Sequence, residues 1–188
     1  MKKLRRRQAA GFSLVEMAVV FLIALTVSAV SIPSVLRSMR TYRLSSTARE
    51  VANILQRTRY EAIRRNTIVN CRTQPQGNTT AVWIDLNDNI AIDPTEPMIL
   101  LPQEIQLLGA GMAPGPASMG FTNAQPPTGA IAFDSRGTVN YGAGAPVVYV
   151  VYLGYPQGTD YGYRAVTLTP MGQTKVWSAS AGGTWHSP

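Results

Sequence analysis

The chain has 188 residues, which is long enough for one domain of ordinary size together with a membrane anchor. Its formal net charge of +7 is concentrated near the N-terminus, because residues 67–188 carry four basic against seven acidic side chains. The high overall charge is therefore no evidence for nucleic-acid binding by itself. One cysteine, Cys71, excludes an intrachain disulfide, and one histidine, His186, leaves too few ligands for a zinc site of the usual kind.

The first 36 residues predict a single membrane-spanning helix. Five Lys and Arg residues lie between Lys2 and Arg7, and no charged residue occurs from Met17 to Leu36. A run of that length can cross a bilayer, and the basic flank keeps the N-terminus in the cytoplasm. A secretory signal would have a shorter apolar run with a small-residue cleavage site after it. A simple signal anchor explains the length and the charges but not Glu16, which costs roughly 2.5–3.5 kcal/mol at a bilayer centre and less near an end.

The stretch around Glu16 gives the anchor a more specific interpretation. Residues 11–16 read Gly-Phe-Ser-Leu-Val-Glu and closely resemble the cleavage and methylation motif of type IV prepilins and type II secretion pseudopilins. The resemblance implies that a prepilin peptidase cuts after Gly11, removes the leader of residues 1–11 and methylates the new N-terminus at Phe12. Residues 12–36 then remain as the transmembrane and assembly helix. The resemblance also implies that Glu16 pairs with the N-terminal amine of a neighbouring subunit and sets the axial register.

Pro33 interrupts the apolar run near its end. It lacks an N–H and its ring clashes with the carbonyl of Ala29, so we expect the helix to bend or open locally there. Many type IV pilins carry a helix-kinking proline at this place. The resemblance therefore implies a role for Pro33 in assembly. The alternative is a kink that is merely tolerated in a membrane helix.

Residues 37–66 predict an amphipathic, cationic continuation of the same helix. From about Ser13 to Arg65 a continuous helix would be roughly 80 Å long at 1.5 Å per residue. An apolar stripe recurs at spacings of three and four and consists of Leu44, Ala48, Val51, Leu55, Thr58 and Ala62, widened by Ile54 and Ile63. Eight arginines occupy most of the remainder: Arg37, Arg40, Arg43, Arg49, Arg57, Arg59, Arg64 and Arg65. They suggest either nucleic-acid binding or a solvated helix face whose partners are acidic sheet residues or neighbouring subunits.

Beyond Asn66 the apolar residues alternate, which predicts a β-rich head over residues 67–178. Strands are expected at residues 80–86, 98–101, 104–108, 130–134, 138–140, 146–153, 164–169 and 174–177, with hairpin turns at 135–137 and 170–172. The expected fold class is α+β, with a long N-terminal helix packed on a small antiparallel sheet. Residues 109–128 are expected to form an exposed functional loop or a mobile insertion, and residues 179–188 a flexible tail.

Three motifs in the head resemble the GspH/FimT minor-subunit family, which includes FimU-like members. They are Trp83–Asn89 followed by Asp93 and Glu96, the Phe-x-x-x-Gly turn Phe133–Gly137, and the closing hairpin Leu168–Gly172. The resemblance implies a type IV pilin-like fold and a minor pilin or pseudopilin. Such a subunit helps to initiate or cap assembly of a type IV pilus or a type II secretion pseudopilus.

The same resemblance implies a structural protein that is not an enzyme and has no cofactor. It implies a single-pass protein of the inner membrane, with a cytoplasmic N-terminus and a periplasmic head, that later joins the pilus or pseudopilus. The implied partners are the prepilin peptidase and N-methyltransferase, the major subunit and other minor subunits.

DNA binding in natural transformation is the alternative function. Some FimT-like members bind DNA through a Gly-Arg-x-Arg pattern near the C-terminus, and the matching place here is Gly172-Gln173-Thr174-Lys175. Only Lys175 is basic in this stretch, so the family's pattern is half present.

One oxygen-rich stretch has the spacing of a calcium loop. Positions 1, 3, 5, 9 and 12 of that spacing are occupied by Asp85, Asn87, Asn89, Asp93 and Glu96. The sharp turn at position 6 requires Gly, whereas this chain has Ile90. A turn rich in Asp and Asn also forms commonly without a metal.

No catalytic motif accompanies the remaining titratable residues. Asp134 with Asp160, or Glu96 with Glu104, are conceivable acid–base pairs, but nothing in their spacing supports catalysis. Cys71 lies at the expected junction between helix and sheet. It is either a small buried hydrophobe or the site of an intersubunit disulfide.

Overall fold

The structure is a computed structural model, and we describe its residues 11–156 and 159–187. Helix α1 (Leu14–Arg65) comes first, and ten strands and two short 3-10 helices follow it in this part of the chain. The chain divides into two compact units, the first ending at Met39 and the second beginning at Arg40. The predicted leader lies outside the described residues, apart from Gly11.

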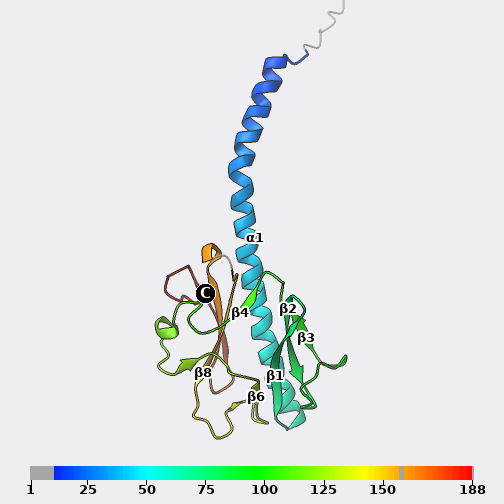
Figure 1. Ribbon diagram of the computed structural model, residues 1–188, viewed down its shortest axis with the longest axis vertical. Coiled ribbons are helices and arrows are strands. Elements are labelled where there is room, and N and C mark those ends of the chain that lie inside the picture. The colour runs from blue at the N-terminus through cyan, green and yellow to red at the C-terminus, as the bar shows by residue number, and fades with distance from the viewer. Residues whose placement is uncertain (1–10, 157–158, 188) are drawn as a thin grey trace, which may run out of the picture. The chain divides into compact units, whose positions relative to one another are not determined.

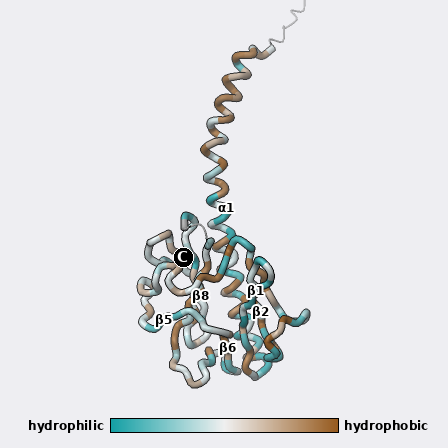
Figure 2. The backbone as a smooth tube through the Cα atoms, viewed as in Figure 1, coloured by the Kyte–Doolittle hydropathy of each residue, from teal (hydrophilic) through white to brown (hydrophobic). Residues whose placement is uncertain are grey.

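The first unit consists of the N-terminal part of α1. Its side chains from Leu14 to Met39 are all exposed, and Figure 2 shows this stretch as predominantly hydrophobic. α1 is long and apolar enough here to cross a membrane, judged by length and composition. The hydroxyls of Thr26 and Ser28 donate to the carbonyls of Ile23 and Ala24, so these polar groups are satisfied within the helix.

The helix remains continuous through Pro33. The sequence predicted a bend or a local opening there; the helix shows no break at this place, although Pro33 removes one backbone donor.

The second unit begins with the C-terminal part of α1. The predicted stripe is confirmed, because Leu44, Ala48, Val51, Leu55, Thr58 and Ala62 are all buried, together with Ile54. Ile63 does not belong to the stripe, since it is 43% exposed. The helix ends as Asn66 adopts a φ of 51° and the amide of Thr67 donates to the carbonyl of Ala62, which is a left-handed C-terminal cap.

One sheet of five antiparallel strands lies on one side of this helix (Figure 1). Its order is β3-β2-β1-β6-β7, with β1 at Val69–Gln76, β2 at Thr79–Asp85, β3 at Met98–Leu100, β6 at Ile131–Phe133 and β7 at Val139–Asn140. The sequence did not predict β1. Only Val69 and Cys71 of this strand are buried, and the rest of it is mostly polar and contains Pro75.

The second sheet has the antiparallel order β10-β9-β8-β4. These strands cover Thr174–Ala179, Tyr163–Leu168, Val148–Gly154 and Gln106–Leu108, and β5 (Ala124–Gln125) pairs with β8 in parallel. The head thus consists of two sheets that share the helix, instead of the single small sheet expected. The 3-10 helices are η1 (Pro116–Met119) and η2 (Thr159–Tyr161).

Two apolar clusters hold the second unit together. The larger joins the stripe of α1 to the inner faces of both sheets and includes Leu55, Ile84, Phe133 and Leu153. Successive residues of a strand point to opposite faces, so Val150 and Tyr152 of β8 belong to a smaller cluster on the other face, with Trp177 and Trp185.

The C-terminal residues complete this smaller cluster. Trp185 is 3% exposed, and its indole N–H donates to the carbonyl oxygen of Pro114 at 3.0 Å. Its amide donates to Ser118 Oγ at 3.0 Å, and Ser178 forms an isolated β-bridge with His186. The tail that was expected to be flexible therefore makes defined contacts with the head at Trp185 and His186. The same contacts fix part of the 109–128 segment, which also contains η1 and β5 and so is not simply a structureless loop.

Candidate functional site

The predicted processing motif lies at the start of the first unit. Residues 11–13 are non-helical and exposed, and α1 begins at Leu14. Glu16 lies in the first turn of α1, where a carboxylate interacts favourably with the helix dipole. The predicted cut after Gly11 thus falls in a non-helical segment next to the start of the helix.

The first unit presents apolar side chains in every direction around the helix. Phe21, Leu22, Leu25 and Val30 are all largely exposed. Burying apolar surface is worth roughly 25 cal/mol per Å², so a helix of this composition is unstable in water by itself. Lipid tails or other apolar helices could cover it.

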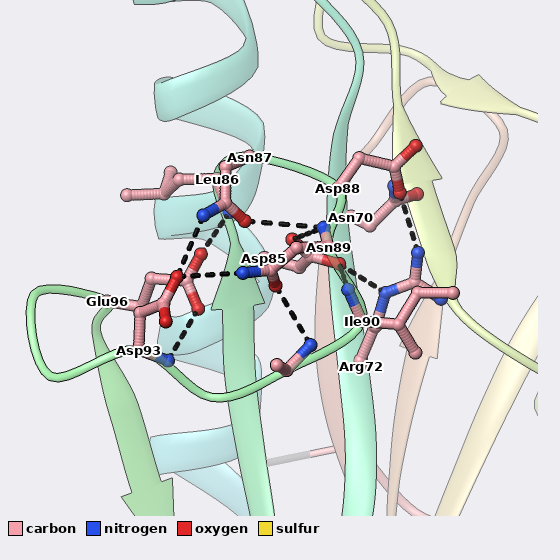
Figure 3. A network of polar contacts seen from close by, with 11 residues as sticks. Asn70, Arg72, Asp85, Leu86, Asn87, Asp88, Asn89, Ile90, Asp93 and Glu96 are labelled. Carbon is pink, nitrogen blue, oxygen red and sulfur yellow. Dashed lines mark hydrogen bonds and ion pairs between the residues drawn. The ribbon is translucent and has the colours of Figure 1, made fainter.

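A polar network surrounds the buried carboxylate of Asp85 at the end of β2 (Figure 3). Asp85 is 1% exposed and accepts a hydrogen bond from Arg72 Nε at 2.6 Å. It also accepts from the amides of Asn89 and Ile90, both at 3.2 Å. Arg72 extends to Asp88 through its terminal nitrogen at 2.7 Å. Arg72 of β1 therefore binds both the end of β2, through Asp85, and the turn after it, through Asp88.

Glu96 closes the other end of this loop. Its carboxylate accepts from the amide of Leu86 at 2.7 Å and from that of Asp93 at 3.3 Å. Asn87 and Asn89 donate from their side-chain amides to Asp93 at 2.8 and 2.9 Å. The loop is thereby cross-linked by hydrogen bonds along most of its length.

These contacts bear on the predicted calcium loop. The five residues come together, but their oxygens accept N–H groups of the loop and of Arg72. Among the residues that the structure describes, no group of three or more His, Cys, Asp or Glu could hold a metal ion. The arrangement is a hydrogen-bonded loop, and the Ile90 backbone, with a φ of 63°, provides the turn for which a calcium loop uses Gly.

The two hairpin motifs are held to α1 at one joint, which is formed by two turns and the helix. The turns after β6 and β9 contain Gly137 and Gly172, whose φ angles are 78° and 76°. Arg59 Nε donates to the carbonyl of Gly137, and Gln56 Nε2 donates to that of Gly172, both at 2.9 Å. A Cβ at Gly172 would overlap with the carbonyl oxygen of Gly137. Both motif glycines are thus required for the close approach of two turns and one helix.

The eight predicted helix arginines separate into groups with different roles. Arg40 donates to the Tyr161 hydroxyl and lies over its ring at 4.9 Å, and Arg59 binds Gly137, so these two fasten the helix to the head. Arg64 and Arg65 pair with Glu61 at 2.6 and 3.2 Å. The hydrogen bond from Arg64 and its neighbour Arg65 lower the pKa of Glu61 despite partial desolvation.

The candidate DNA-contacting residue, Lys175, is exposed on β10. Its ammonium lies 4.5 Å from the centre of the Trp177 ring, in a cation–π contact. The matching glycine, Gly172, belongs to the turn packed on α1. The stretch therefore presents one cation that already has an intramolecular partner.

Cys71 is buried in β1 between β2 and β6. Burial raises the pKa of its thiol to about 12, so the unreactive protonated form dominates at neutral pH. It borders an apolar cavity of about 470 Å³ between the sheets, together with Val82, Leu107 and Val151. Of the two alternatives for Cys71, the structure favours a buried hydrophobe.

Two of the four conceivable acid–base residues, Asp134 and Glu96, have structural roles. Asp134 accepts from the amides of Arg136 and Thr138 and from the Thr138 hydroxyl in the turn after β6. Burial opposes ionisation of Asp134, but the bonds from Thr138 outweigh it and lower the pKa of the carboxyl. Glu96 is occupied by the loop amides. Sequence reasoning missed Arg72 and assigned Arg59 only to the cationic helix face, because the partner of each is recognisable only in the folded chain.

Comparison with known proteins gives two findings. The model of a family described as type II transport protein GspH matches residues 47–172. The crystal structure of the type IV minor pilin FimU from Pseudomonas aeruginosa strain PAO1 is similar in fold, with a TM-score of 0.50 and 15% sequence identity. The similarity covers 77% of this chain and 93% of that one. No curated protein matches the sequence.

Proposed function

Because this chain belongs to the family of type II transport protein GspH, we propose that it is a minor subunit that helps to initiate or cap assembly of a type IV pilus or a type II secretion pseudopilus. The observation that carries the proposal is the exposed apolar helix that begins within the Gly11–Glu16 motif. A subunit of this kind is a structural protein, and its assembly partners are other pilins or pseudopilins.

The proposed sequence of events begins in the inner membrane, with the basic leader in the cytoplasm and the head in the periplasm. Prepilin peptidase cuts after Gly11 and methylates Phe12. Residues 12–36 then leave the bilayer as they pack with the corresponding helices of neighbouring subunits. Hydrophobic burial favours this packing, because the alternative outside the membrane is exposure to water.

Glu16 gives the packing its register in this proposal. Within a bundle of apolar helices a carboxylate is stable only when it is paired, and the amine at Phe12 of the adjacent subunit is the available cation. A shift of the helix along its neighbour would separate the two charges. The pair therefore selects one axial position among many that are equally apolar.

The test is Glu16→Ala in the full-length chain, expressed in a cell that assembles the fibre. We expect normal removal of the leader, seen as a smaller protein by mass spectrometry, with incorporation into the sheared fibre fraction reduced at least about tenfold. Glu50→Ala, on the exposed face of the second unit, is the matched control and should incorporate normally. Normal incorporation of the Glu16 variant would contradict the proposal.

The alternative, a DNA-binding minor pilin, has less support. It depends on Lys175, which contacts Trp177, and the surrounding residues 67–188 are net acidic. A gel shift with duplex DNA at low salt tests it, since binding through phosphates weakens as salt rises.

A further inference from the structure

A polar pocket of the second unit lies beside Arg40, the first residue of that unit. It has a volume of about 590 Å³ and combines charged side chains of both signs with two aromatic rings. We call it the Arg40 pocket, and we consider five of its lining residues: Arg40, Glu104, Tyr155, Asp160 and Tyr161. Arg40, Glu104 and Asp160 are exposed, so their charges are open to a ligand from outside the head.

The aromatic wall of the pocket is fixed to the helix. Tyr155 is buried, and its hydroxyl donates to the carbonyl of Arg40 at 3.0 Å. The rings of Tyr155 and Tyr161 pack edge to face, with their centres 5.1 Å apart. Arg40 lies over the Tyr161 ring, and its Nη1 donates to the Tyr161 hydroxyl. The guanidinium is thus held in place, and because it has five N–H donors, others remain available to an anion.

The charges around the pocket suit a ligand that carries both signs. Among the ion pairs of the described residues, none involves Arg40, Glu104 or Asp160. Burial and then the charge of Glu104 raise the pKa of Tyr155, whereas the charge of Arg40 lowers it, so both charges act on the same space. An anion would meet two carboxylates there and a cation would meet an arginine. A molecule with a phosphate and an ammonium has a partner for each.

The pocket lies close to a membrane surface while the chain is anchored. The uncharged run from Met17 to Leu36 is about as long, at 1.5 Å per residue, as the hydrocarbon core is thick. Arg40 is the fourth residue after Leu36, and such a stretch of chain spans at most about 14 Å. The headgroup layer extends roughly 5–8 Å beyond the hydrocarbon core. Phospholipid headgroups are therefore within reach of the pocket.

We propose that the Arg40 pocket binds the headgroup of a phospholipid that carries a primary ammonium, as in phosphatidylethanolamine. Arg40 donates N–H groups to the phosphate, and the ammonium donates to the carboxylates of Glu104 and Asp160. A choline headgroup has no N–H donor, and an anionic headgroup is repelled by the two carboxylates, so both bind less well. The inference rests on the membrane stage of the proposed function, before the subunit joins a fibre.

The membrane is the source of this ligand, rather than phosphoethanolamine free in solution. Exposed charge pairs contribute at most about 1 kcal/mol each, so the pocket by itself binds a headgroup weakly. The anchor compensates for this weakness, because a tethered site meets its ligand at a high effective concentration. The bound lipid holds the head at the bilayer surface until assembly withdraws the helix.

The experiment uses the full-length chain in nanodiscs that contain equal amounts of phosphatidylethanolamine, phosphatidylcholine and phosphatidylglycerol. Native mass spectrometry identifies the lipids that stay bound when the protein is released from the disc. We expect one molecule of phosphatidylethanolamine to be retained at least about fivefold more often than either of the other two lipids.

Variants of the charged side chains show which groups bind. Arg40→Gln should lower the retention of phosphatidylethanolamine at least about fivefold, because the phosphate loses its charged donor. Glu104→Gln together with Asp160→Asn should shift the preference to phosphatidylglycerol. The repulsion of an anionic headgroup is then removed, while Arg40 remains.

Matched controls separate the pocket from the rest of the chain. Arg57→Gln and Glu50→Gln, which remove exposed charges elsewhere on α1, should retain lipids as the unmodified chain does. A photo-cross-linking amino acid at Gln103, which also lines the pocket, should capture phosphatidylethanolamine. The same amino acid at Tyr60, exposed near the C-terminal end of α1, should capture no lipid. Protection of buried Cys71 from a maleimide shows in each case that the head is folded.

Three outcomes would overturn the site: no preference of the unmodified chain for phosphatidylethanolamine, a preference that survives Arg40→Gln, or capture of lipid at Tyr60 as readily as at Gln103. Retention of free phosphoethanolamine in detergent as readily as of the lipid would exclude the membrane as its source. None of these measurements requires a fibre, so they leave the proposed function standing. That function is rejected separately, if the unmodified chain is absent from sheared fibres.

Discussion

Asp85 illustrates how a single carboxylate organises a segment far longer than itself. The residue is buried, and three N–H donors from two directions converge on its oxygens. Its partner Arg72 is contributed by the neighbouring strand, so the pair exists only once β1 and β2 are in register, with Arg72 opposite Trp83 and Asn70 opposite Asp85. The charge at Asp85 therefore stabilises both the loop and the strand pairing.

We predict that Asp85→Ala lowers the free energy of unfolding by about 3 kcal/mol, because Arg72 and two amides lose their acceptor. Urea denaturation monitored by tryptophan fluorescence measures the change. Glu104→Ala is the control, since that carboxylate is exposed, and it should differ from wild type by less than about 0.5 kcal/mol. Equal stabilities for the two variants would show that the network contributes nothing to folding.

Gly11 is a second single residue with a specific predicted role, which is in processing. The residue precedes the helix and has open space around it, so a side chain there does not disturb the fold. We predict that Gly11→Phe leaves the leader attached, whereas Ser13→Ala is processed normally. Intact-protein mass spectrometry of membrane fractions distinguishes the two forms. A methylated Phe12 at the N-terminus of the Gly11 variant would disprove the predicted requirement for glycine at the cut.

At the scale of elements, the head depends on contacts between turns and the helix as much as on strand pairing. The turns after β6 and β9 meet on Arg59 and Gln56, and the amide of Val139 donates to the carbonyl of Pro170 at 2.9 Å. This joint links α1 to one edge of each sheet, at β7 and at β10. Two motifs about 35 residues apart in the sequence are thus one structural feature.

Two glycines with similar backbones allow the joint to be tested. Gly172 has a φ of 76° and is crowded by Gly137 and Arg59, whereas Gly77 in the β1–β2 turn has a φ of 59° and open space around it. We predict that Gly77→Ala costs about 1 kcal/mol, the price of a left-handed backbone with a Cβ. Gly172→Ala should cost about 3 kcal/mol or more, because the turn must also move away.

Urea denaturation curves of the two alanine variants measure this difference. If both variants lost the same stability, the backbone conformation alone would account for the loss, and the close packing at the joint would be unimportant.

At the scale of the whole molecule, the chain combines a segment that is unstable in water with a head that has its own cores. The first unit exposes apolar side chains all along α1, whereas the second contains both apolar clusters. The two units therefore require different surroundings. Lipid or other subunits must cover the first, and the second is compact by itself.

We predict that residues 40–188 fold without the anchor and stay soluble, because both clusters lie within them. Circular dichroism and thermal unfolding of this fragment should match those of the full chain in detergent to within a few degrees. The same fragment should fail to enter the fibre, since it lacks the apolar helix. An unfolded or aggregated fragment would mean that the first unit is required for folding.

Local periodicity was sufficient to predict the apolar anchor, the buried stripe of α1 and most strands of both sheets. These features depend on which residues lie three, four or two positions apart, and that information is contained in short stretches of sequence. The processing motif is likewise contained in one short stretch, residues 11–16. The stripe was wrong only at Ile63, which lies close to the helix end and is exposed there.

The sequence by itself thus determined the helix, the β-rich head and the family resemblance. The tertiary structure alone decided that β1 is a strand, that the head has two sheets, that Arg72 pairs with Asp85 and that Trp185 packs near Pro114. Each of these depends on residues distant in the sequence. Their meeting is set by strand register and by the closure of long loops, which no local pattern encodes.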